Sequence, residues 1–212
     1  MSACTLCEKR RPQRWCPGVR EEICARCCGE EREVTINCPF ECEYLQEARR
    51  REKPPNRDPR TLPNADIRVT EQFLEENEWL LAQVSRLLLT AATESSGVVD
   101  DDVQEALEAM IKTLRTRESG LIYETRPNNP YAGVIQQRVQ AGIEEVRRQE
   151  AKSTGVHTIR DKGVLGVLVF LQQLAFRVNN GRRRGRAFLD FVRTNFVAHA
   201  PAPEQRGSVV TP

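Results

Sequence analysis

The residues best suited to carry chemistry in this sequence are eight cysteines, all of which lie within the first 42 residues. They comprise two Cys-x2-Cys pairs, two later Cys-Pro dipeptides and two further single positions. Paired thiolates at this spacing are typical ligands of structural zinc, which takes four of them in a closed tetrahedral site. The candidate metal ligands are Cys4, Cys7, Cys16, Cys24, Cys27, Cys28, Cys38 and Cys42.

Eight thiolates suffice for two four-ligand sites, and we favour two zinc ions with an interleaved pairing. One ion would be held by Cys4, Cys7, Cys24 and Cys27, and the other by Cys16, Cys28, Cys38 and Cys42. This pairing ties together segments that are distant in sequence, in a stretch with too few apolar residues to fold by burial alone. Structural zinc contributes about 10–16 kcal/mol of apparent binding at neutral pH, and that energy stabilises the fold. A single zinc ion with four spare thiols is the alternative.

Other interpretations of the cysteines explain less of the pattern. Inert buried cysteines would not need paired spacing, and an iron–sulfur cluster would use only four of the eight. Disulfides are not expected, because the first residues lack a basic and apolar leader. We therefore expect a cytoplasmic protein, in which thiols stay reduced. A thiol redox sensor that releases zinc on oxidation is a further hypothesis.

The order of the ligands resembles that of the cross-braced zinc modules of the B-box and RING type. The B-box pattern has a Cys-x2-Cys/His pair, a cysteine, a second Cys-x2-Cys pair and two late ligands, and seven of these cysteines fit that order. The chain departs from it at Val19, where B-boxes carry Asp or Cys, so Cys28 would have to substitute. The segment from Arg14 to Leu45 is also similar to the Cys-rich segment of uncharacterised bacterial proteins with a helical remainder. These resemblances imply a bacterial zinc-binding protein that contacts other proteins.

The whole sequence predicts a mainly α protein in four parts. A Cys-rich zinc module covers residues 1–48, a Pro- and Arg-rich linker residues 49–66, an all-α helical bundle residues 67–198 and a disordered tail residues 199–212. Apolar residues recur at helical spacing in about five segments, which begin near Thr70, Asp102, Asn129, Asp161 and Gly185. The apolar piece Leu121–Tyr123 is expected to pack against the bundle, and Gly163 and Gly166 are expected to permit close helix packing.

Outside the cysteines the sequence offers little reactive chemistry. Its two histidines, His157 and His199, fall in a connection and in the tail. The chain contains no nucleophile elbow, phosphate-binding glycine loop or His-Glu-x-x-His motif. The longest apolar run, Gly163–Leu171, is shorter than the roughly 20 residues that a bilayer span needs. We therefore expect a non-enzymatic protein without a membrane segment.

The net charge of +2 creates no global field towards nucleic acid or membranes, so electrostatic recognition would depend on local clusters. One cluster lies in the linker and one before the last helix: Arg49, Arg50, Arg51, Lys53, Arg57 and Arg60, and then Arg182, Arg183, Arg184 and Arg186. These clusters support a nucleic-acid-binding regulator as the alternative function. The leading hypothesis is an adaptor whose zinc module and bundle each bind a protein partner. The oligomeric state is left open.

Overall fold

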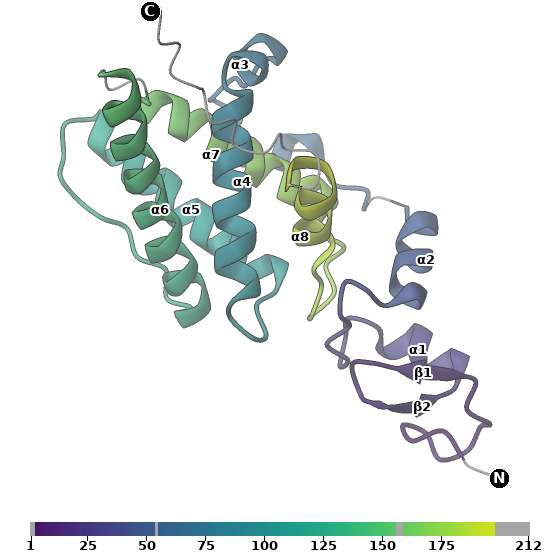
Figure 1. Cartoon of the computed structure of the whole chain (residues 1–212). Coiled ribbons are helices and arrows are strands. Elements are labelled where there is room, and N and C mark those ends of the chain that lie inside the picture. The colour runs from purple at the N-terminus through teal and green to yellow at the C-terminus, as the bar shows by residue number, and fades with distance from the viewer. Residues whose placement is uncertain (1–2, 54, 156–158, 198–212) are drawn as a thin grey trace, which may run out of the picture.

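The computed structural model of the chain describes residues 3–53, 55–155 and 159–197 and shows a mainly helical protein (Figure 1). A small N-terminal module contains the antiparallel strands β1 (Arg14–Cys16) and β2 (Glu21–Ile23) and the helix α1 (Ala25–Glu31). From the module, α2 (Glu43–Arg51) leads to a larger helical part. That part comprises α3 (Glu71–Glu76), α4 (Glu78–Thr93), α5 (Asp100–Glu118), α6 (Pro130–Thr154), α7 (Asp161–Val178) and α8 (Ala187–Val192). The predicted mainly α fold with a Cys-rich module at its N-terminal end is confirmed.

The bundle is built around α7, which packs against α4, α5 and α8, while α6 closes it across α4 and α5 (Figure 1). Every residue from 164 to 169 is buried, which explains why the sequence of α7 is apolar nearly all round. A Cβ atom at Gly166 would lie 2.3 Å from Cζ of Phe73. The missing side chain at Gly166 therefore lets α3 pack closely on α7, as expected from the sequence.

Some helix boundaries differ from the sequence pattern. The first predicted helix is broken at Asn77, which ends α3 and precedes α4, and whose Nδ2 donates to the carbonyl of Phe73 at 2.8 Å. α5 begins at Asp100, and the carboxylate of Asp102 accepts the N–H of Val99 at 2.8 Å. After α8 the chain continues as a π-helical turn over Arg193–Val197. Among the described residues, the part predicted as about five helices thus contains six α-helical segments.

The Pro- and Arg-rich segment predicted as a linker contacts the bundle. α2 extends to Arg51 and so crosses the predicted boundary at residue 48. Farther along, Nη2 of Arg57 donates to the carbonyl of Asn179 at 3.0 Å, and the amide of Asn64 donates to Oε1 of Gln172 at 2.6 Å. The segment therefore fastens the chain to α7 and the turn after it. The predicted tail, residues 199–212, lies outside the described residues.

Candidate metal centre

The hairpin and the start of α1 bring the two Cys-x2-Cys pairs together. β1 and β2 pair in antiparallel register, with Arg14 opposite Ile23. The first Cys pair lies against β2, since the N–H of Thr5 donates to the carbonyl of Glu22 at 3.4 Å. The second pair follows β2 directly, and Cys24 is the N-cap residue of α1. The β-hairpin reverses the direction of the chain. It thus places Cys24 beside Cys4, although the two residues are 20 positions apart in sequence.

The sulfur atoms of Cys4, Cys7, Cys24 and Cys27 all lie within 4.8 Å of one another. Three of these residues are buried, and Cys7 is half-buried. Four sulfurs at such separations can close around one tetrahedral metal ion, and four protein ligands leave no position for a substrate. The structure therefore assembles one of the two predicted ligand sets.

Hydrogen-bond donors point at these sulfurs. The N–H of Cys24 donates to Sγ of Cys4 at 3.2 Å, and the N–H of Cys27 donates to Sγ of Cys24 at 3.4 Å. Nη1 of Arg10 lies 4.0 Å from Sγ of Cys7, and the hydrogen bond to the Cys24 sulfur raises the pKa of Arg10. Four thiolates outweigh the two positive charges of a divalent ion, so these donors stabilise a metal-loaded, anionic site.

The four thiols cannot ionise independently at this distance, because each thiolate disfavours the next. Burial raises the pKa of Cys4, but the N–H groups of Cys24, Cys7 and Leu6 outweigh burial and lower this pKa to about 6. A hydrogen bond with the Cys24 sulfur, together with burial, raises the pKa of Cys27 to about 12. The cluster therefore releases a first proton readily and retains a last one. Binding of a divalent cation favours the thiolate form of all four cysteines and so displaces this last proton.

The second predicted ligand set is spread over β1, α1 and the turn before α2. Cys16, Cys28 and Cys38 are buried, and Cys42, the N-cap residue of α2, is half-buried. Burial raises the pKa of Cys38, and charge on Cys42 and Cys16 raises it further. In the described part of the chain, no three of these sulfurs lie mutually within the 4.8 Å of the first cluster. The second ion therefore stays a prediction.

The loop after α1 joins the module to the bundle through Glu33, which is only 1% exposed. Its carboxylate accepts from Nη2 of Arg49 at 2.6 Å, from Nδ2 of Asn180 at 2.9 Å and from the N–H of Arg186 at 3.0 Å. The sequence alone does not predict this role for Glu33, because nothing in the charged run around it distinguishes a buried carboxylate from a solvated one.

Two neighbouring contacts complete this junction. Phe40 of the module is 7% exposed and packs with the core of the bundle, and the guanidinium of Arg186 lies 4.3 Å from its ring centroid. On the other side, the Asp100 carboxylate accepts the N–H groups of Phe188 at 2.8 Å and Leu189 at 3.1 Å. Burial raises the pKa of Asp100 to about 7, against the effect of these two donors. The junction therefore holds buried carboxylates through hydrogen bonds from both sides.

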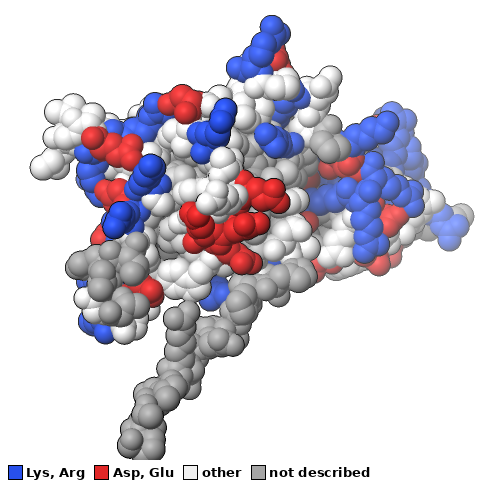
Figure 2. All heavy atoms as spheres, turned by 90° about the horizontal axis from the view of Figure 1, so that it is seen from above, with Lys and Arg blue, Asp and Glu red and all other residues white. Residues whose placement is uncertain are grey.

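Several arginines of the predicted basic clusters are engaged within the chain. Arg49 bridges Glu33 and Asp190, and Nη1 of Arg182 donates to the carbonyl of Arg32 at 2.8 Å. In the cluster before α8, Nη2 of Arg186 donates to the carbonyl of Cys38 at 2.5 Å. Figure 2 shows acidic and basic side chains interspersed over the viewed face, with Lys and Arg gathered towards the end that carries the module. Each cluster therefore leaves fewer arginines available to an external ligand than its sequence contains.

Comparisons with known proteins add no relative to this description. A scan against models of protein families finds no match, and neither the curated proteins nor the solved structures give one. The resemblance to B-box and RING modules and to bacterial Cys-rich proteins therefore stays an expectation. None of the described helices is long and apolar enough to cross a membrane. His157 and His199 lie outside the described residues.

Proposed function

We propose that the chain is a non-enzymatic zinc-binding adaptor in which the metal has a structural role. The observation that carries this proposal is the cluster of four cysteine sulfurs within 4.8 Å of one another. Catalytic zinc sites keep an open position for water or substrate, whereas a four-thiolate site is closed. Thiolate ligands favour zinc over the hard cations magnesium and calcium, which prefer oxygen.

Zinc would also explain how the module is ordered. Apart from cysteines, the buried apolar residues of its core are Ile23, Ile36 and Leu45. Burial of one such side chain contributes roughly 1.5–3 kcal/mol. Structural zinc contributes about 10–16 kcal/mol, so one ion outweighs all three.

We further propose a second zinc ion bound by Cys16, Cys28, Cys38 and Cys42. Nη1 of Arg14 and Nη2 of Arg32 lie 3.6 and 3.8 Å from Sγ of Cys28. Two guanidinium groups beside this sulfur would donate hydrogen bonds to a metal–thiolate site and offset its negative charge. This support is independent of the first cluster.

Elemental analysis of protein purified without added metal tests both ions. We expect two zinc ions per chain in the wild type, and loss of one ion in Cys24→Ser and in Cys38→Ser. Leu6→Ser is the matched control, because Leu6 lies between the ligands Cys4 and Cys7 but is 40% exposed, and it should keep both ions. If only one ion binds, Cys38→Ser keeps the wild-type content. Purified protein without any bound metal contradicts the proposal.

The adaptor role needs a separate experiment, in which wild-type and Cys24→Ser proteins capture partners from a lysate of the source cells. We expect protein partners on the wild type that the Cys24→Ser protein loses, because the module surface depends on the metal. The same partners on both proteins would count against the module as a binding surface. Turnover of a substrate by the purified chain would contradict the non-enzymatic assignment.

Nucleic-acid binding is the second candidate, favoured by the exposed side chains of Arg50 and Arg51 at 75% and 80%. Both side chains pair with Glu47, and Arg49 and Arg182 are engaged at the junction, so we rank this function below the adaptor. It requires binding to duplex DNA or single-stranded RNA that weakens steeply with salt. Arg50→Gln with Arg51→Gln should then reduce the salt dependence. Absence of binding at low salt would exclude it.

A further inference from the structure

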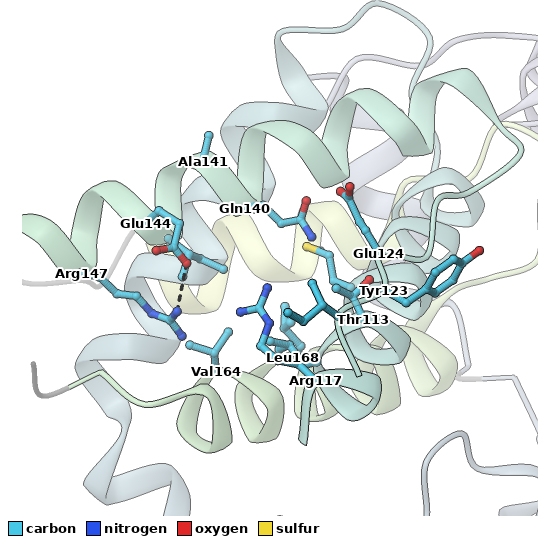
Figure 3. A pocket seen from close by; sticks show the side chains of 14 residues that line it. Thr113, Arg117, Tyr123, Glu124, Gln140, Ala141, Glu144, Arg147, Val164 and Leu168 are labelled. Carbon is cyan, nitrogen blue, oxygen red and sulfur yellow. Dashed lines mark hydrogen bonds and ion pairs between the residues drawn. The ribbon is translucent and has the colours of Figure 1, made fainter. Parts of the chain in front are cut away.

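A hollow of about 530 Å³ lies between α5, α6 and α7, beside the connection from α5 to α6 (Figure 3). In Figure 3, Arg117 and Gln140 point into it. Its volume falls within the roughly 300–1,000 Å³ of pockets that receive another molecule. Its floor is apolar and buried, and consists of Met110, Leu114, Ile143, Val164 and Leu168.

An exposed apolar segment lies at the edge of this hollow. Leu121, Ile122 and Tyr123 are 62%, 103% and 68% exposed, and the last two line the hollow. The ring of Tyr123 points away from the hollow (Figure 3). The expectation that this segment packs against the bundle is therefore wrong. Three consecutive apolar side chains in water mark a contact surface for another molecule.

The charged residues around the hollow are mixed in sign. Arg117 and Arg147 share its lining with Glu124 and Glu144. Asp161 accepts from the two arginines at 3.3 and 2.6 Å. A rim of this kind does not attract a polyanion or a polycation. Nη1 of Arg147 also donates to Glu144 at 2.9 Å, so the rim charges are largely paired within the chain and do not repel a second copy that presents the same rim.

We propose that this face is a two-fold interface between two copies of the chain, in which Leu121–Tyr123 of each copy enters the hollow of the other. A two-fold contact uses the same patch on both copies, so the patch must supply both the inserted group and its receptor. Here an apolar protrusion and an apolar hollow lie side by side. Burial of one side chain of this size contributes about 1.5–3 kcal/mol. The two-fold axis repeats each contact, so every buried side chain contributes once in each copy.

The proposed interface lies away from the Cys-rich module. In Figure 1 the connection between α5 and α6 runs along the side of the bundle opposite the module. A dimer formed through this face would leave both modules accessible. The inference does not depend on metal binding or on the adaptor role.

Sedimentation velocity over a series of concentrations tests the association. The wild type should shift from monomer to dimer as concentration rises, and Ile122→Asp should raise the dissociation constant about tenfold or more. Because Ile122 is 103% exposed, this variant should keep the fold, which circular dichroism checks. Gln140→Trp, which fills the hollow from a half-buried position on α6 that points into it (Figure 3), should also weaken the dimer. Gln149→Trp adds the same apolar group at an exposed α6 position outside the lining and should leave the constant unchanged.

Photo-cross-linking identifies the receptor. Ile122 is replaced by p-benzoylphenylalanine, and isotopically light and heavy chains are mixed before irradiation. We expect mixed-isotope products at Met110 and its neighbours in the floor. Products within a single chain would show that the segment closes over its own hollow and would overturn the proposal. A monomer at every concentration, or a dimer that Ile122→Asp and Gln140→Trp leave intact, would overturn it as well.

Discussion

Glu33 has a left-handed backbone conformation, with a φ of 53°, and an almost fully buried carboxylate. That conformation costs a residue with a side chain roughly 1–2 kcal/mol. Its carboxylate accepts from Arg49, Asn180 and Arg186, and its carbonyl accepts the N–H of Arg184 at 2.8 Å. These contacts offset the cost of the conformation and hold the loop after α1 against the α7–α8 connection.

Replacing Glu33 by alanine should lower the free energy of unfolding by about 3 kcal/mol, because Arg49 would stay buried with one of its two acidic partners removed. A urea titration of the zinc-loaded protein, followed by circular dichroism, measures this change. Glu30→Ala is the matched control, since Glu30 pairs with Arg26 at the surface, where both side chains are more than half exposed. That variant should lose less than about 1 kcal/mol. Equal losses in the two variants would show that Glu33 does not fasten the module.

At the scale of elements, two helical glycines have different surroundings. Gly166 on α7 faces the ring of Phe73, which a Cβ atom would approach to 2.3 Å. A Cβ atom at Gly133 on α6 would meet its nearest neighbour, Cγ of Pro127, at an ordinary 4.0 Å. Alanine favours a helix over glycine by about 1 kcal/mol, so only the packing separates these positions.

We expect Gly166→Ala to destabilise the protein by about 1–3 kcal/mol, because Phe73 must move and α3 with it. Gly133→Ala should stabilise the protein by up to about 1 kcal/mol, since it gains helix propensity without a clash. Thermal and urea unfolding of the two variants beside the wild type measure both changes. If both substitutions stabilise, the close approach of α3 to α7 is not required for the fold.

At the scale of the whole molecule, the metal module and the bundle meet where two main-chain carbonyls of the module accept hydrogen bonds across the junction. The N–H of Arg184 donates to the carbonyl of Glu33, and Nη1 of Arg182 donates to the carbonyl of Arg32, both at 2.8 Å. The accepting carbonyls follow α1 directly, and α1 carries Cys27 of the sulfur cluster. Loss of order in the module should therefore reach the α7–α8 connection.

Removal of metal by a chelator should speed amide hydrogen exchange both in the module and in residues 179–190. The second effect is expected because the hydrogen bonds across the junction are lost when α1 is no longer held by metal. Exchange in α6, which lies away from the junction, should stay unchanged, and added zinc should restore protection. Opening of the module with full protection at residues 179–190 would show that the junction survives without metal.

Several features of this protein depend on residues close in sequence, and these could be predicted. The spacing of Cys4 to Cys7 and of Cys24 to Cys27 indicated a metal cluster, and Asn129-Pro130 indicated the start of α6. The apolar pattern predicted a helix that begins near Asp161, which is where α7 begins. Ligand spacing, helix capping and helical periodicity act within a few residues of the chain, so a single sequence reveals them.

Other features were decided by tertiary contacts alone. Glu33 meets Arg186 across 153 positions, and the predicted linker meets α7 across more than 100. Whether Ile122 is buried or exposed depends on how α5, α6 and α7 pack, and its apolar character alone predicted the opposite of what is found. Contacts of this range leave no local pattern, because either partner would occur equally well in a solvated loop.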